Sequence, residues 1–175
     1  FAVYDSYSLS VDNFNCTECV GGSGALDGYY ITRTTLSNVH IVRNYGYHPW
    51  YGGYAAGVAM MYCGTVEIYN GLWEENRDGA YAALVIEDSQ PGYNYLSNLQ
   101  FLNNEVGAVS FGYNEASNYT WMDNCDFQNN TVVSSSAAAL GLYGGLYYVT
   151  NTAFVRNKAA KFAGAIMNEY SDMYL

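Results

Sequence analysis

The residues with the clearest potential for catalysis are carboxylates. Cleavage of a polysaccharide needs carboxyl groups that converge on one face, or an Arg or Lys base beside acidic calcium ligands. Asp123 and Asp126 are three residues apart, so on a strand they face opposite sides. His40 and His48 are isolated in the sequence. Because no acidic cluster forms, we predict no catalytic residues, no cofactor and no enzymatic activity. The acidic candidates are Glu67, Glu74, Glu75, Asp78, Asp123 and Asp126.

Four cysteines could support redox or metal chemistry. Cys16 and Cys19 have the spacing of a redox motif or of half a metal site, but no second pair completes a zinc set. We therefore predict no metal site. The even number of cysteines suits a secreted protein. Cys125 is expected to be a small buried side chain, and the pairing of Cys16, Cys19 and Cys63 remains open.

Three tripeptides have the N-glycosylation pattern Asn-x-Ser/Thr. They begin at Asn15, Asn118 and Asn129. A glycan requires an outward side chain, and the strand pattern described below turns Asn15 and Asn129 outward. The sequence therefore predicts N-linked glycans and a location outside the cell or on its surface.

The charge balance excludes two classes of partner. The chain has 175 residues and a net charge of −10, only 13% of it is charged, and no Lys precedes Lys158. An acidic surface without basic patches argues against nucleic acid and anionic membranes. No apolar run is long enough to span a bilayer, so we expect no membrane insertion.

A nine-residue pattern recurs six times and must position these groups. It consists of an apolar residue, Asn two positions later, a large apolar residue after three more positions, and a second Asn three positions after that. The leading Asn recurs at steps of 25, 32, 28, 26 and 27 residues, which indicates a repeat architecture. The copies are 11–19, 36–44, 68–76, 96–104, 122–130 and 149–157.

Apolar and polar positions alternate within each copy, which is the period of a strand. About 25 residues per repeat suffice for three short strands and their bends. The pattern therefore predicts an all-β fold, a right-handed parallel β-helix of about six coils that forms one domain over residues 1–175. The large apolar position should form one interior row, which is Cys16, Ile41, Trp73, Phe101, Phe127 and Phe154.

The asparagines should stack in two columns, because equivalent positions of neighbouring coils lie about 4.8 Å apart and an amide both donates and accepts. The first column is Asn13, Asn38, Asn70, Asn98, Asn124 and Asn151. The second is Asn44, Asn76, Asn104, Asn130 and Asn157, with Cys19 in the first copy.

Two further positions follow from the same repeat. An outward column places Arg43 between Glu18 and Glu75, which predicts a charge ladder across neighbouring strands. The alanine-rich segments 55–62 and 137–142 have helix propensity, but the repeat requires strand there.

Motifs near the end of the chain resemble a known family. The segment 154–157 (FVRN), followed by 163–166 (AGAI), resembles the FxxN and GGA[ILV] motifs of polymorphic outer-membrane proteins, and 101–104 and 127–130 match in part. Those proteins are surface adhesins with right-handed β-helical passenger regions. The repeats also resemble pectin-lyase-like surface proteins, although the NTD, paired-Asp, GHG and RIK signatures of pectin-degrading enzymes are absent. The resemblance implies the fold more than an activity.

Functional expectations rest on aromatic residues and on the ends of the coil. No polar capping repeat is recognisable, so adjoining coils of the same polypeptide or copies of the chain should cover the ends. We hypothesise an extracellular structural glycoprotein, a segment of a filament or appendage built by end-to-end stacking. The alternative is an adhesin that binds a cell-surface or glycan ligand, and a carbohydrate-active enzyme is the weakest hypothesis. The ligand or partner loop would be Tyr45, Tyr47, Trp50, Tyr51 and Tyr54.

Overall fold

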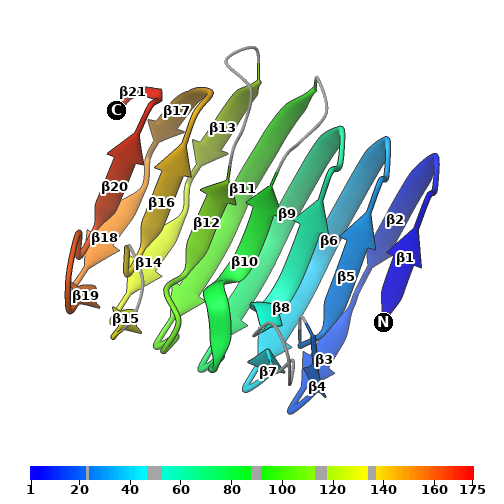
Figure 1. The fold of residues 1–175 in the computed structure, drawn as a ribbon, viewed down its shortest axis with the longest axis horizontal. Helices are drawn as coiled ribbons and strands as arrows, with labels where there is room; N and C mark the ends of the chain where they lie inside the picture. Colours follow the sequence, from blue (N-terminus) through cyan, green and yellow to red (C-terminus); the bar gives the residue numbers. More distant parts are fainter. Residues whose placement is uncertain (23, 47–52, 88–91, 113–117, 134–136) are drawn as a thin grey trace.

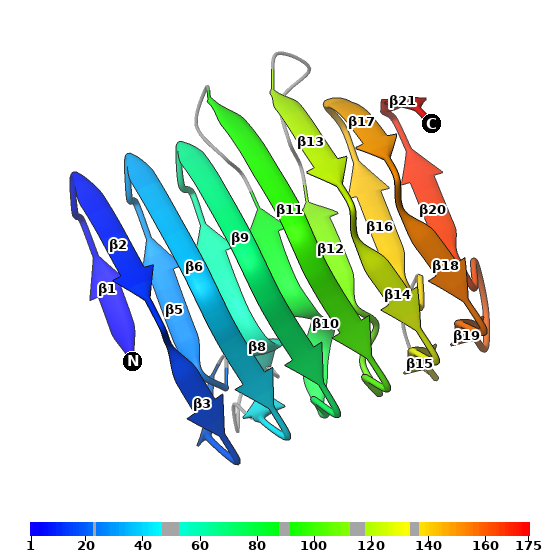
Figure 2. The same cartoon turned by 180° about the vertical axis from the view of Figure 1, so that it is seen from behind.

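The computed structural model is a right-handed coil of about six turns whose strands run parallel from turn to turn (Figures 1 and 2). It describes residues 1–22, 24–46, 53–87, 92–112, 118–133 and 137–175. The regular elements of these residues are all strands. The fold is thus the parallel β-helix that the repeat predicts.

Two parallel sheets enclose the interior. Figure 2 shows the longer strands of the second sheet side by side along the axis. The first sheet has seven strands: β1 (Ala2–Tyr4), β5 (Leu26–Tyr29), β8 (Gly53–Met61), β10 (Gly79–Glu87), β12 (Val109–Gly112), β16 (Leu140–Tyr143) and β20 (Ile166–Glu169). The second has ten: β2 (Ser8–Asp12), β3 (Asn15–Thr17), β6 (Arg33–Val42), β9 (Thr65–Glu74), β11 (Tyr93–Leu102), β13 (Tyr119–Asp123), β14 (Asp126–Gln128), β17 (Leu146–Thr150), β18 (Ala153–Val155) and β21 (Asp172–Tyr174).

Two short strand pairs complete the turns at one edge. They are β4 (Val20–Gly21) with β7 (Tyr45–Gly46), and β15 (Thr131–Val132) with β19 (Lys158–Ala159).

The predicted interior row is present and in register. Cys16 pairs with Ile41, Ile41 with Trp73, and the series continues through the three phenylalanines to Phe154. The rings of Trp73 and Phe101 lie 5.1 Å apart, and the next two ring pairs are each 5.0 Å apart. Such pairs contribute about 0.5–1.5 kcal/mol beyond the area they bury. Phe154 is the half-buried member of the row.

Each turn bends at residues with left-handed backbone conformation. The six leading asparagines have φ between 49° and 57° and form the first corner of each turn. The predicted charge column forms the second corner of each turn, with φ of 58° at Glu18, 53° at Arg43 and 53° at Glu75. Arg43 does bind Glu18, with 3.1 Å between Nε and Oε1. The column is nevertheless a corner rather than the strand position that we predicted.

The alanine-rich segments follow the repeat only in part. β8 contains residues 55–61, as predicted. In the other segment the strand begins at Leu140, and Ala137 forms only an isolated bridge to Ala163.

Candidate functional site

The second asparagine column forms a buried hydrogen-bonded ladder, which we call the inner ladder (Asn44, Asn76, Asn104, Asn130 and Asn157). Each amide Nδ2 donates to Oδ1 of the next asparagine over 2.9–3.2 Å. The same Oδ1 also accepts the backbone N–H of the preceding asparagine over 3.0–3.1 Å. Every step between neighbouring turns is therefore made by the same pair of bonds.

The inner ladder also bonds each turn to the strand of the preceding turn. Nδ2 of Asn104 donates to the carbonyl oxygen of Trp73 over 3.0 Å, and the other members make equivalent bonds of 2.8–3.0 Å. The first four members are fully buried and Asn157 is half-buried. Cys19 replaces asparagine in the first turn, and its backbone N–H donates to Oδ1 of Asn44 over 2.8 Å. A buried amide that makes all these bonds avoids the cost of desolvation.

The first asparagine column forms an exposed ladder. Its amides donate to the preceding turn, whereas those of the inner ladder donate to the next asparagine along the chain. Asn124 donates to Asn98 over 2.6 Å and Asn98 donates to Asn70 over 3.1 Å. Aspartates accept from the asparagines of the next turn: Oδ1 of Asp12 accepts from Asn38, and that of Asp123 from Asn151, each over 2.8 Å.

Hydrogen bonds lower the pKa of both aspartates. For Asp12 the largest cause is the hydroxyl of Ser37, followed by the amide of Asn38. For Asp123 it is the hydroxyl of Thr150, followed by Asn151. Both carboxylates are acceptors within the ladder, which explains why they do not form an acidic site.

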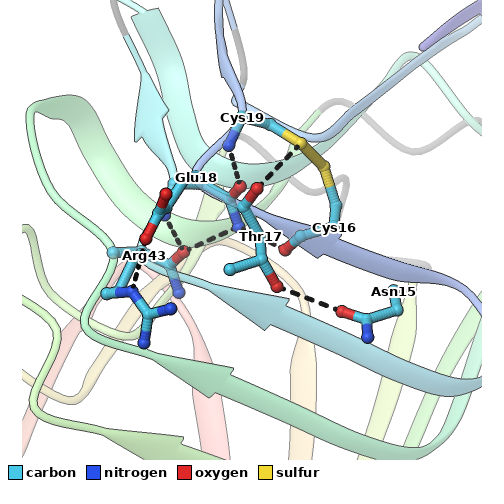
Figure 3. Close-up of polar contacts among 8 residues, drawn as sticks. Asn15, Cys16, Thr17, Glu18, Cys19 and Arg43 are labelled. Carbon is cyan, nitrogen blue, oxygen red and sulfur yellow. Dashed lines mark hydrogen bonds and ion pairs between the residues drawn. A yellow bond between two sulfur atoms is a disulfide. The ribbon is translucent and has the colours of Figure 1, made fainter.

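Cys16 and Cys19 are joined by a disulfide at the second corner of the first turn (Figure 3). Because the disulfide uses both sulfur atoms, Cys16 and Cys19 do not form a CxxC metal half-site in this structure. Cys63 and Cys125 are buried free thiols. Burial raises the pKa of Cys125 to about 12, as expected for a small apolar side chain without a reactive thiolate.

The three glycosylation candidates differ in accessibility. Asn15 is exposed on β3, and the hydroxyl of Thr17 donates to its Oδ1 over 3.2 Å (Figure 3). Asn129 lies at the second corner and is exposed. The side chain of Asn118 is only 1% exposed, and its Oδ1 accepts the backbone N–H of Gly92. A glycan on Asn118 is incompatible with this packing, so we do not expect this sequon to carry one.

The outer face of the ten-stranded sheet carries an aromatic row, defined as Tyr95, Trp121, Tyr148 and Tyr174. These residues are neighbours in register on successive turns. The rings of Trp121 and Tyr148 lie 5.6 Å apart, and those of Tyr148 and Tyr174 lie 5.3 Å apart. Tyr119 stacks on Trp121 at 5.8 Å. Trp121 remains 38% exposed, so the row is accessible to a ligand.

The aromatic row was not predicted from the sequence, although a signal for it exists. Each of the first three members stands three residues before a leading asparagine, on the outward phase of the strand. Extending the repeat by one alternation toward the N-terminus would have aligned them.

Glu67 occupies the same column one turn before Tyr95. Its carboxylate accepts from the hydroxyl of Tyr93 over 2.8 Å, from Arg33 over 3.1 Å and from Thr35 over 3.3 Å. Burial alone raises the pKa of Glu67, but the bonds from Tyr93, Arg33 and Thr35 outweigh it and lower the pKa overall. An ionised carboxylate with three donors is a poor general acid.

Tyrosines occupy the third corner of the turn, where the chain passes from the seven-stranded sheet to the ten-stranded sheet. Tyr30 and Tyr62 lie at equivalent positions of neighbouring turns. The backbone N–H of Tyr30 donates to the carbonyl oxygen of Met61, the residue before Tyr62. Their rings lie 5.0 Å apart with an interplanar angle of 10°. Both have left-handed backbones, with φ of 54° and 56°.

The seven-stranded sheet has a hollow of about 200 Å³ on its outer face. Small residues on β12 and β16 create it, and Glu87 contributes the single carboxylate among its lining residues. The lining residues are Tyr81, Glu87, Val109, Ser110, Gly112, Ala137, Gly141 and Tyr143.

The predicted Tyr/Trp loop lies mostly outside the described residues, as do Tyr47, Trp50 and Tyr51 themselves. Tyr45 is exposed on β7. Tyr54 belongs to β8, but its side chain is outside the described part. The loop stays a prediction.

Within the described residues, no three His, Cys, Asp or Glu side chains are grouped as metal ligands. The same part of the chain contains no helix suited to crossing a membrane. Comparisons with protein-family profiles, with curated protein sequences and with solved structures gave no match. The assignment of a β-helix therefore rests on the coil itself.

Proposed function

We propose that this chain is a structural β-helix segment of an extracellular glycoprotein, part of a surface filament or appendage in which turns are the stacking units. The inner ladder is the observation that carries the proposal. Through the bonds between asparagines, each turn offers donors to the next turn and an acceptor to the preceding one, so turns can be added by the same chemistry, either within one polypeptide or between copies. The resemblance to β-helical surface proteins supports the same location.

An axial repeat tests the structural role. In micrographs of the native polypeptide we expect rods, and in their diffraction a meridional spacing of about 4.8 Å from stacked turns. Sedimentation should show assembly that grows with protein concentration. Compact particles that stay monomeric at every concentration would contradict the proposal.

Glycan mapping tests the extracellular role. The chain would be expressed through a secretory pathway and analysed by mass spectrometry before and after removal of N-glycans. Asn15→Gln should remove one glycan, whereas Asn118→Gln, its matched control at a buried sequon, should remove none. A secreted protein without sugar at Asn15 and Asn129 would argue against a glycoprotein.

The aromatic row favours a second function, that of an adhesin for a glycan. Sugar rings pack their C–H faces on aromatic side chains, and Trp121 and Tyr119 are exposed on one sheet face. The net charge of −10 favours a neutral glycan over an acidic one.

Binding to immobilised neutral glycans tests this function. Trp121→Ala should abolish binding through the row, and Trp50→Ala with Tyr51→Ala should abolish binding through the predicted loop. Tyr170→Ala is the control, because Tyr170 is exposed at the third corner and belongs neither to the aromatic row nor to the predicted loop. Unchanged binding by all variants would reject both ligand surfaces.

A further inference from the structure

The third corner holds three tyrosines, Tyr30, Tyr62 and Tyr170, in a left-handed conformation that tyrosine normally avoids. A left-handed backbone costs a residue with a Cβ free energy that glycine does not lose, and asparagine tolerates it better than bulky residues do. The first corner uses asparagine in every turn, and the third corner uses Gly144 in a later one. Tyr30 and Tyr62 therefore stand where a smaller residue would fit with less strain. Strain of this kind points to a function for the side chains.

The two phenol rings are both stacked and open to solvent. Their centroids are 5.0 Å apart, their planes differ by 10°, and the two residues are 51% and 37% exposed. The register of β5 and β8 holds them together, because Tyr29 pairs with Met61. Stacked, accessible phenols held by a rigid sheet are suited to reaction with one another.

We propose that Tyr30 and Tyr62 form a site of oxidative coupling that joins neighbouring turns through a dityrosine bond. The oxidant is a peroxide, used by a haem peroxidase that removes one electron and one proton from each phenol. This site stands independently of the proposed structural role.

The reaction balances with one peroxide. Each phenol loses its hydroxyl hydrogen and becomes a phenoxyl radical, and hydrogen peroxide is reduced to two waters. The radicals combine through one Cε of each ring, the carbon next to the hydroxyl-bearing carbon. The hydrogen on each joined carbon then moves to its phenol oxygen. The protein gains one C–C bond and loses two hydrogen atoms.

Exposure alone would favour other tyrosines. Tyr170 is 95% exposed and Tyr7 is 83% exposed, but neither has a stacked ring among the described residues. Tyr4 and Tyr29 stack at 5.2 Å, with Tyr29 partly buried beneath the corner. Tyr148 and Tyr174 stack at 5.3 Å, but only Tyr174 is exposed. Tyr30 and Tyr62 are stacked and both exposed, which makes the selectivity of the reaction a direct test.

The experiment treats the full chain with hydrogen peroxide and a haem peroxidase at a concentration where chains rarely meet. We expect dityrosine fluorescence, and a cross-linked pair of peptides that contains Tyr30 and Tyr62 and is lighter by two hydrogens. Tyr30→Phe and Tyr62→Phe keep the stacked rings but should each eliminate this product. Tyr170→Phe is the matched control and should leave it unchanged.

Two outcomes would overturn the site. One is coupling that occurs mainly through Tyr7 or Tyr170, and the other is a product that persists in Tyr30→Phe. The same reaction in denaturant should lose the Tyr30–Tyr62 product, because the fold holds the rings together. Its persistence there would show that the stacked geometry does not direct the coupling. Circular dichroism of each variant confirms that the coil is intact.

Discussion

Asparagine has two roles in this coil, one for its side chain and one for its backbone. In the inner ladder the buried amide connects neighbouring turns, and in the exposed ladder asparagine mainly supplies the left-handed bend. The same residue type therefore differs in energetic importance with its column. The two roles can be separated by substitution.

Asn104→Ala should lower the free energy of unfolding by about 3 kcal/mol, because the substitution leaves the buried N–H of Asn76 without a partner and removes the amide bond to the carbonyl of Trp73. Asn98→Ala should cost only about 1 kcal/mol, since its main effect is to place alanine in a left-handed conformation. Urea unfolding of both variants gives the comparison. Equal losses would show that burial does not distinguish the ladders.

At the second corner, asparagine is the stabilising choice. Glu75 and Arg156 have φ of 53° and 55° there, whereas Asn103 and Asn129 occupy the same column of other turns. Glu75→Asn and Arg156→Asn should each raise the free energy of unfolding by about 0.5 kcal/mol, since asparagine tolerates left-handed φ better. Thermal unfolding would show this as a higher Tm. Arg43→Asn is the contrasting variant, because it also removes the bond to Glu18.

The strands are matched to the side chains that they enclose. Trp73 is the largest residue of the interior row, and glycine at positions 57 and 71 leaves room for its indole. A Cβ added at Gly71 would lie 2.3 Å from Cζ3 of Trp73, and one added at Gly57 would lie 3.1 Å from Cδ1. The indole Nε1 is buried without a hydrogen-bond partner among the described residues. The large ring and the small neighbours therefore form one packing unit.

Gly71→Ala should destabilise the protein by about 1–3 kcal/mol through overpacking against Trp73. With Trp73→Phe the same alanine should cost at least about 1 kcal/mol less, because the smaller ring provides space. A double-mutant cycle measured by urea unfolding checks the coupling. Additive losses would mean that the indole can move aside in the parent protein.

The strand columns could be predicted from the sequence, whereas much of the surface could not. The interior row and both asparagine columns follow from spacing, because each position repeats once per turn. The disulfide could not be predicted, since the bend at Glu18 that brings Cys19 back toward Cys16 does not appear in a strand pattern. The burial of Asn118 was missed because it lies outside the nine-residue pattern.

At the scale of the whole molecule, carboxylates connect the turns. Asp12 and Asp123 accept side-chain hydrogen bonds from the next turn. Glu67 accepts hydrogen bonds from side chains on its own face of the ten-stranded sheet. All three have pKa values below their usual ranges. The stability of the coil is thereby linked to pH, even though the outer surface carries a large negative charge.

A carboxyl whose pKa is lower in the folded state adds stability above its unfolded pKa, and this stability is lost as the pH falls through the folded pKa. We therefore expect the free energy of unfolding to be lost on acidification below the usual range of Asp and Glu. Glu67→Gln should flatten this loss in unfolding curves measured across acidic pH. Glu169→Gln removes the same formal charge from an exposed position and is the matched control. Parallel curves for the two variants would contradict this role of Glu67.

The backbone bonds between turns and those of the inner ladder all lie along the axis, and this direction has a mechanical consequence. If the two ends were pulled apart, the bonds at an outermost turn would carry the load before those further in. The coil would then give way turn by turn, with small extensions at modest force, instead of rupturing all at once. A covalent clasp between two turns would halt the unravelling there.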